Sequence, residues 1–328
     1  MSSPALPVEG TWLGQKALTL ETDGLKFVTI PGMGAKIVSL FDKTARREWL
    51  LPPINRPFKP VAYGAAFADQ DMSGWDEMFP TINACTYPVK GAYAGRSLPD
   101  HGEVWALPWQ TERVTQTCIR LSTIGQALPY RLTRQTELVS ANQFRLTYEV
   151  INTGTGPLAA LWTAHPQFMV DAETRIRLPA SVDSLVNVHQ TADWGAVGNR
   201  YSWPLAQSQQ GQFHRLDQIG EPALHNCRKF YLPADHPVSW AALQQGHDGA
   251  WIRLSWNVSE LPYLGIWVDE GAYNTASTAA LEPSTGFYDA LDFAWRNNRA
   301  MTLQPAEPVR WTLTIELGVG TIIDTDRA

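Results

Sequence analysis

The chain has 328 residues, of which 44% are apolar and 18% charged, and a formal net charge of −6. This is the composition of a globular protein with enough apolar side chains for a large core. No run of like charges marks a basic or acidic tail, which argues against nucleic acid or an anionic membrane surface as a partner.

The cysteines and the N-terminus predict the compartment. Cys85, Cys118 and Cys227 lie far apart and have no CxxC spacing, so they form no zinc motif and suit a reducing compartment. The opening MSSPALPVEGTW lacks the basic and apolar regions of a signal peptide. No apolar run approaches the roughly 18 residues of a membrane helix. We therefore expect a soluble, cytoplasmic protein.

Alternating apolar and polar residues predict strands along most of the chain. The first is a hairpin over residues 18–30, which turns at Asp23-Gly24. Further strands are predicted over residues 37–41, 118–123, 130–140, 143–154, 251–258, 264–270 and 310–318. In the strand 143–154, the period of two places Phe144, Leu146, Tyr148 and Val150 on one face.

Helices are expected only as short turns, near residues 57–71 and 287–295. The segment 178–232 is the least regular and is expected to decorate a sheet edge or to cover a site. No linker composition marks a boundary, so we predict one domain over residues 1–328. The predicted fold class is all-β, a large antiparallel β-sandwich.

Two histidines and a glutamate are candidates for acid-base chemistry. His165 follows an apolar run in ALWTAHPQF, His101 follows Asp100 in LPDHGEVW, and Glu282 has apolar neighbours in AALEPSTGFYDAL. Imidazole titrates near neutral pH, Asp100 is expected to orient His101, and half-burial would raise the pKa of Glu282. The structural alternatives are a core histidine, a turn histidine and a surface glutamate.

Several segments occur in an order that resembles the aldose 1-epimerase (galactose mutarotase-like) family. They are GWDEMFPTI (74–82), GRSLPDHGEVW (95–105), LWTAHPQF (161–168), LGIWVDEGAYN (264–274), ALEPSTGFYDAL (280–291) and LQPAEPVRWTLTIELG (303–318). The resemblance implies a β-supersandwich and an isomerase that interconverts the α and β anomers of a free sugar. It implies no cofactor, and a small-molecule sugar as the partner.

The resemblance also implies roles for the three candidates. His165 would be the general acid that faces the ring oxygen. His101 would be a second sugar contact, and Glu282 the general base that takes the proton from O1. The chemistry fits these residue types, because ring opening removes one proton from the anomeric hydroxyl and delivers another to the ring oxygen.

Other polar and aromatic residues of these segments are candidates for substrate binding. Hydrogen bonds to sugar hydroxyls are expected from Asp76, Glu77, Arg96 and Asp269, and stacking from Trp75, Trp162 and Trp267. For each the alternative is a surface or core position. The family's sugar-binding aspartate has three candidates here, namely Asp235, Asp248 and Asp269.

Ala164 departs from the asparagine that many galactose-type members carry before the second histidine. Other functions therefore stay open: a mutarotase for a phosphorylated or other anionic sugar, a non-catalytic carbohydrate-binding protein, and an accessory domain of a polysaccharide lyase or hydrolase. No metal site is predicted, because the histidines lack the local spacing of a metal motif. The sequence does not predict the oligomeric state.

Overall fold

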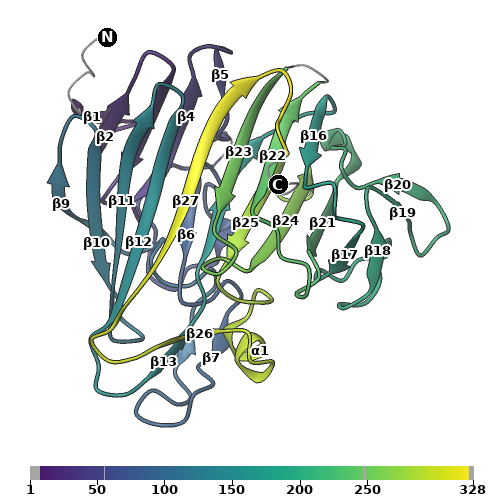
Figure 1. The fold of residues 1–328 in the computed structure, drawn as a ribbon. Coiled ribbons are helices and arrows are strands. Elements are labelled where there is room, and N and C mark those ends of the chain that lie inside the picture. Colours follow the sequence, from purple (N-terminus) through teal and green to yellow (C-terminus); the bar gives the residue numbers. More distant parts are fainter. Residues whose placement is uncertain (1–7, 55, 247–248, 325–328) are drawn as a thin grey trace.

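The computed structural model describes residues 8–54, 56–246 and 249–324. Two large antiparallel sheets dominate these residues, one in front of the other in Figure 1. The 13-stranded sheet runs in the order β1 (Val8–Trp12), β2 (Gln15–Glu21), β3 (Leu25–Ile30), β4 (Lys36–Asp42), β6 (Trp75–Met78), β14 (Thr163–Pro166), β25 (Ser277–Ser284), β24 (Tyr263–Glu270), β21 (Asn226–Tyr231), β17 (Ser184–Asn187) and β18 (Arg200–Ser202). Two short strands complete it, β5 (Arg47–Glu48) beside β4 and β15 (Phe168–Met169) beside β25.

The second sheet has eight strands, in the order β16 (Thr174–Arg177), β22 (Trp240–Gln245), β23 (Ala250–Trp256), β27 (Pro308–Val319), β12 (Gln143–Asn152), β11 (Tyr130–Ser140), β10 (Cys118–Ile124) and β9 (Gln110–Val114). The remaining strands form the pairs β13 (Leu158–Ala160) with β26 (Met301–Leu303), β19 (Leu205–Gln207) with β20 (Phe213–Arg215), and β7 (Cys85–Thr86) with β8 (Ser97–Leu98). The described helices are α1 (Leu291–Arg296) and the 3₁₀ turns η1 (Phe67–Asp69) and η2 (Pro222–Leu224). None of the helices in these residues is long and apolar enough to cross a membrane.

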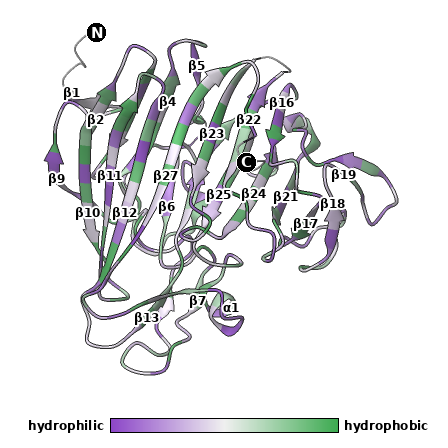
Figure 2. Ribbon diagram, viewed as in Figure 1, coloured by the Kyte–Doolittle hydropathy of each residue, from purple (hydrophilic) through white to green (hydrophobic). Residues whose placement is uncertain are grey.

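The core fills the space between the two sheets. Figure 2 shows hydrophobic and hydrophilic residues alternating along the strands of the eight-stranded sheet. All four residues predicted to share a face of β12 are fully buried. One of them, Phe144, meets Phe27 of β3 across the sandwich, with 5.4 Å between ring centroids. The predicted all-β antiparallel sandwich is therefore confirmed, whereas one domain over residues 1–328 stays a prediction.

The predicted elements match the structure where alternation is strong. The hairpin 18–30 is β2 and β3, and the other predicted strands are β4, β10, β11, β12, β23, β24 and β27. The predicted helical turns are η1 and α1, although α1 begins only at Leu291. Strand β25 was not predicted because it is buried on both faces, so its sequence does not alternate.

The irregular segment 178–232 extends a sheet edge, as expected. Strands β17 and β18 extend one edge of the 13-stranded sheet, with the β19–β20 hairpin beyond them (Figure 1). The same segment also supplies His189 and Lys229 to the wall of a cavity.

Candidate active site

The site begins at a break in the 13-stranded sheet. Thr163 of β14 pairs with Ser284 of β25, and Phe168 of β15 pairs with Ala279. Between these two pairs Pro166 lacks the backbone N–H that a ladder needs. The pairing with β25 has the same register on both sides of the break. Continued across the break, this register places His165 opposite Glu282. Residues far apart in the chain therefore become cross-strand neighbours.

The side chains that form the site share the sheet face turned away from the core. On β21, Lys229 and Tyr231 lie on this face, and the register places them opposite Trp267 and Gly265 of β24. Gly265 lies in turn opposite Glu282. A Cβ atom at Gly265 would lie only 3.0 Å from Glu282 Oε2 and 3.1 Å from the Tyr231 ring. The absence of a side chain there lets the neighbouring strands bring their polar groups together.

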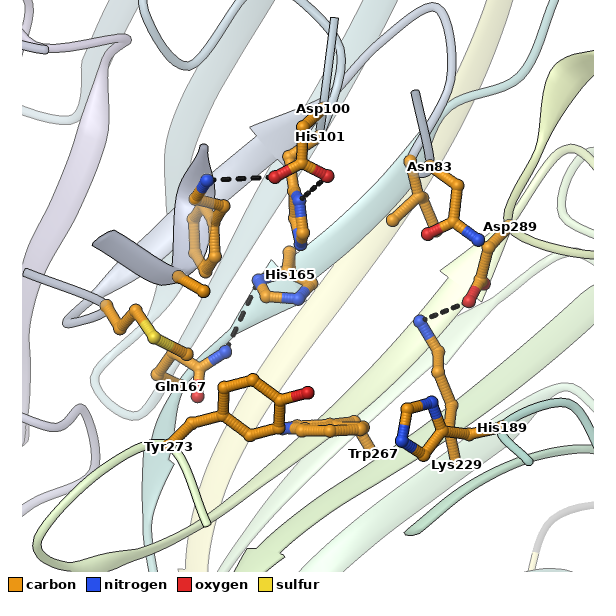
Figure 3. Close-up of a pocket in the computed structure, with 14 residues that line it drawn as sticks. Asn83, Asp100, His101, His165, Gln167, His189, Lys229, Trp267, Tyr273 and Asp289 are labelled. Carbon is orange, nitrogen blue, oxygen red and sulfur yellow. Dashed lines mark hydrogen bonds and ion pairs between the residues drawn. The ribbon is translucent and has the colours of Figure 1, made fainter. Parts of the chain in front are cut away.

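A cavity of about 240 Å³ opens over this face. It is lined by Phe67, Ala68, Met72, Ile82, Asn83, Asp100, His101, His165, Gln167, His189, Lys229, Trp267, Tyr273 and Asp289. Figure 3 shows the two histidines His101 and His165 on one side of it and Lys229 with Asp289 on the other. Small-molecule sites usually measure about 300–1,000 Å³, so this cavity suits a small ligand such as a single sugar ring.

His165 and Glu282 are in contact at the floor of the cavity. His165 Nε2 lies 3.8 Å from Glu282 Oε1, and Glu282 itself is fully buried one layer beneath the lining residues. Burial lowers the pKa of His165 well below its usual value, and the charges of His101, Lys229 and Lys36 lower it further. Burial raises the pKa of Glu282 to about 7, although Lys229 opposes the shift. Both shifts disfavour the charged form of the group, so a single proton on the pair is held more readily by Glu282 than by His165.

Lys229 joins two carboxylates. Its Nζ atom lies 2.8 Å from Glu282 Oε2 and 3.0 Å from Asp289 Oδ2. The Tyr231 hydroxyl donates to the other Asp289 oxygen, at 2.7 Å. Burial alone would lower the pKa of Lys229, but the two carboxylates raise it above its usual value. The lysine is therefore charged at neutral pH.

His101 is held by its neighbours on the opposite wall. The predicted orienting contact is present, with His101 Nδ1 2.9 Å from Asp100 Oδ1. The other Asp100 oxygen accepts the backbone N–H of Phe67 at 2.8 Å, and the Phe67 ring stacks on His101 with 4.1 Å between centroids. The aspartate binds Nδ1, which leaves Nε2 for a ligand.

Gln167 holds His165 from the other side. Its backbone N–H donates to Gly74 O at 2.7 Å, and its carbonyl accepts Leu51 N–H at 2.8 Å. With its position fixed in this way, the side-chain Nε2 lies 3.4 Å from His165 Nδ1. This contact fixes the orientation of the imidazole ring and leaves Nε2 as the nitrogen that faces Glu282.

Trp267 lines the cavity with its indole ring, and its stacking on a sugar stays a prediction. Its ring contacts Tyr273 and His189 edge-on, with centroid distances of 5.6 and 5.7 Å. Asp269, in contrast, does not line the cavity. Its carboxylate accepts the backbone N–H groups of residues 272, 273 and 274 at 2.8, 3.1 and 2.8 Å. The prediction that Asp269 contacts a sugar is therefore corrected, since it holds the loop that carries Tyr273.

Asp76 and Trp75 also lie outside the cavity lining. Asp76 is adjacent to His165 in the sheet but is fully buried, with its carboxylate 2.6 Å from Lys36 Nζ. Trp75 is fully buried and packs edge-on against Phe168. Both predictions of sugar contact are corrected, because the carboxylate is committed to a buried lysine and the indole belongs to the core.

Glu77 and Trp162 belong to the core between the sheets. Glu77 Oε1 accepts bonds from Arg134 and Tyr148, both at 2.8 Å, and Trp162 Nε1 donates to Oε2 at 3.0 Å. None of these side chains lines the cavity. The sugar contacts predicted for Glu77 and Trp162 are therefore corrected. Alternation along β6 turns Glu77 to the opposite sheet face from Asp76.

The Glu77–Arg134 ion pair makes a prediction about stability. Arg134→Met should lower the free energy of unfolding by about 3–5 kcal/mol, because it leaves the Glu77 charge buried without its partner. Denaturant unfolding measures the change. Arg145→Met, at an exposed position of β12, is the control and should change stability by less than about 0.5 kcal/mol. Equal stability of the two variants would contradict the interpretation.

Arg96 and the remaining aspartate candidates also lie elsewhere. Arg96 Nη1 donates to Ala127 O at 2.7 Å, and the guanidinium lies over the Tyr93 ring. Its predicted sugar contact is corrected, since this contact pins a surface loop. Asp235 is exposed and lies 3.8 Å from Arg200, and Asp248 falls outside the described residues.

Sequence reasoning missed Lys229, Asp289 and Gln167. The available signal was weak: Lys229 lies directly before the apolar residues 230–232, and a lysine that is buried beside such residues is almost always paired. Asp289 lies in the same segment as Glu282, and Gln167 is two residues from His165. The residues that the structure describes contain no group of three or more His, Cys, Asp or Glu side chains placed to hold a metal ion.

Comparison with known proteins supports the fold. No family model matches the sequence, and no curated protein does. Among solved structures, a galactose mutarotase related enzyme from Lactobacillus acidophilus is 15% identical with a TM-score of 0.66, covering 93% of this chain and 98% of its own. A galactose mutarotase-like protein from Lactobacillus casei is 17% identical with a TM-score of 0.65, covering 92% and 100%. One from Clostridium acetobutylicum is 16% identical with a TM-score of 0.64, covering 96% and 98%.

These similarities extend over nearly the whole of each chain. The protein therefore has the galactose mutarotase-like fold, the fold that the resemblance in sequence implied. At these identities the likeness concerns the fold, and the activity has to be argued from the site.

Proposed function

We propose that this protein is an aldose 1-epimerase that interconverts the α and β anomers of a neutral free sugar. The observation that carries the proposal is the contact between His165 and Glu282 beneath a cavity of single-sugar size. Glu282 Oε1 is buried and has no hydrogen-bond donor among the described residues. Such an acceptor needs a donor, and the anomeric hydroxyl of a sugar would supply one.

The proposed reaction moves two protons. Glu282 takes the proton from O1, the electrons of that O–H bond form the C1=O carbonyl, and the C1–O5 bond breaks. His165, which holds the one transferable proton of the pair as an imidazolium, gives that proton to O5 and becomes a neutral imidazole. After rotation about C1–C2, the reverse steps close the ring on the other face. The Lys229 and His165 side chains must part slightly for O1 to reach Glu282, which a flexible lysine side chain permits.

The other residues of the wall have binding roles in this proposal. His101, held by Asp100, offers its Nε2 to a sugar oxygen near C1 or the ring. Trp267 offers an aromatic surface to the C–H groups of the sugar. A neutral sugar is favoured over a phosphorylated one. Among the described lining residues Lys229 is the one lysine or arginine, and two carboxylates already contact it.

The rate should fall as pH rises above about 7. The reaction needs one transferable proton on the His165–Glu282 pair, whichever of the two holds it in the free protein. The raised pKa of Glu282, about 7, means that the pair loses this proton above that pH. The lowered pKa of His165 places the acid limb, where the pair gains a second proton, well below 6.5.

The measurement is kcat/KM for anomer exchange between pH 5 and 9. We expect a decline that approaches about tenfold per pH unit on the alkaline side. A value that stays constant from pH 7 to 9 would contradict a one-proton pair.

The first test of the function is saturation-transfer NMR of anomer exchange on a panel of free aldoses and their 6-phosphates. Acceleration on a free aldose supports the proposal. Preference for a phosphate would establish the anionic-sugar alternative. Sugar binding without acceleration would establish a carbohydrate-binding protein instead.

A further inference from the structure

Two lysines of the 13-stranded sheet are buried, and each contacts two carboxylates, but their surroundings differ. Lys36 Nζ has three acceptors, Asp71 at 3.3 Å, Asp76 at 2.6 Å and the carbonyl of Ser73 at 2.8 Å. An ammonium group has three N–H donors, so all three donors of Lys36 are used. Lys36 does not line the cavity, and its role is structural.

Lys229 has only two acceptors in the part of the chain that the structure describes, Glu282 and Asp289. It is 7% exposed and lines the cavity (Figure 3). Its third N–H is therefore free to bind a ligand. A buried donor left without a partner costs roughly 1–3 kcal/mol, which a ligand oxygen at this position would recover.

We propose that Lys229 is a catalytic residue whose third N–H donates to the anomeric oxygen O1. The proposal rests on the function proposed above and adds a residue to it. Lys229 Nζ lies 2.8 Å from one oxygen of Glu282, so a hydroxyl bound by that carboxylate comes within reach of the ammonium group. As Glu282 removes the proton, negative charge develops on O1 beside a fixed positive charge. The ammonium group transfers no proton.

The two carboxylates beside Lys229 suit this role. Glu282 and Asp289 keep Lys229 charged, and Tyr231 fixes Asp289 in turn. His189 and His165 are the other titratable groups affected by its charge. The lysine is thereby held as a cation at the point where charge develops.

The test compares ligands that differ only in O1. Binding of D-glucose and D-galactose, and of the 1-deoxy analogue of each, is measured by saturation-transfer NMR titration for the wild type, Lys229→Met and Lys36→Met. We expect Lys229→Met to weaken aldose binding by about 10-fold or more and to leave binding of the 1-deoxy analogues unchanged. Lys36→Met, the matched control, should not alter the ratio of the two affinities.

Kinetics give a second readout. Lys229→Met should lower kcat by about 100- to 1,000-fold, as the loss of one oxyanion donor does elsewhere. The charge of Lys229 lowers the pKa of both Glu282 and His165, so its removal should shift both limbs of the pH profile to higher pH. The shift of the limbs follows from the loss of the charge whatever the role of Lys229, so the discriminating readout is the loss of kcat measured at the new pH optimum, which a purely structural lysine would not cause.

The outcomes separate the two proposals. The role of Lys229 would be overturned if Lys229→Met lost equal affinity for the aldose and its 1-deoxy analogue, or lost none. It would also be overturned if the wild type bound neither aldose. A wild type that binds an aldose without accelerating its exchange would overturn the proposed function, while the affinity ratio still decides whether Lys229 contacts O1. Lys229→Met leaves both Glu282 and Asp289 without the lysine. If this variant does not fold, Lys229→Met/Asp289→Asn, which removes one of these two negative charges, is measured instead.

Discussion

Glu282→Gln should lower the rate of anomer exchange by about 100- to 10,000-fold, the usual contribution of a positioned general acid or base. The amide has nearly the same shape as the carboxylate, but it cannot accept the O1 proton. Asp289 remains beside Lys229 at 3.0 Å, so the lysine keeps one counter-charge and the fold should persist. The measurement is saturation-transfer NMR on the accelerated sugar, with circular dichroism to confirm the fold.

Glu270→Gln is the matched control for this variant. Glu270 is also buried, lies on the neighbouring strand β24 and pairs with Arg228 at 2.6 Å, but it does not line the cavity. This substitution should cost stability and leave the rate nearly unchanged. If both variants kept the wild-type rate, Glu282 would be a structural carboxylate.

His165→Gln should have an effect of similar size. The glutamine amide can place a hydrogen-bond donor near the position of Nε2, but it cannot carry a proton to O5, so about 100- to 10,000-fold of the rate should be lost. The effects of two residues that act as one unit are not additive. The double variant with Glu282→Gln should therefore be little slower than either single variant.

His214→Gln provides the control for the histidine. His214 is partly buried against Trp194, with 5.5 Å between ring centroids, and lies outside the cavity lining. Its replacement should leave the rate nearly unchanged. Additive losses in the His165 and Glu282 double variant would instead show that the two groups act independently.

The architecture was predictable because burial on one face leaves a period of two in the sequence. In β12, Phe144 and Leu146 face the core and Arg145 faces solvent, and this alternation identified the strand. Short strands such as β6 and β14, and the fully buried β25, carry no such pattern. Their place in the sheet depends on pairing with residues far along the chain, which a local pattern cannot encode.

The candidate site was predictable only in part. His165, His101 and Trp267 were expected at the site and line the cavity, and Glu282 lies directly beneath them. The orienting contact from Asp100 was also expected. The function of each in catalysis stays a prediction until the variants are measured.

By itself the sequence determined the fold class, and it singled out His101, His165 and Glu282 as candidates for the site. Both follow from apolar periodicity and ordered motifs, which are local properties of the chain. Only the tertiary structure decided which charged residues face the cavity. Asp76 and Glu77 are adjacent in sequence, yet one binds Lys36 and the other Arg134, on opposite faces of the sheet. Lys229 and Glu282 are far apart in the chain, yet Lys229 Nζ lies 2.8 Å from Glu282 Oε2. Strand order and register set these partners, and both follow from pairing across the whole sheet.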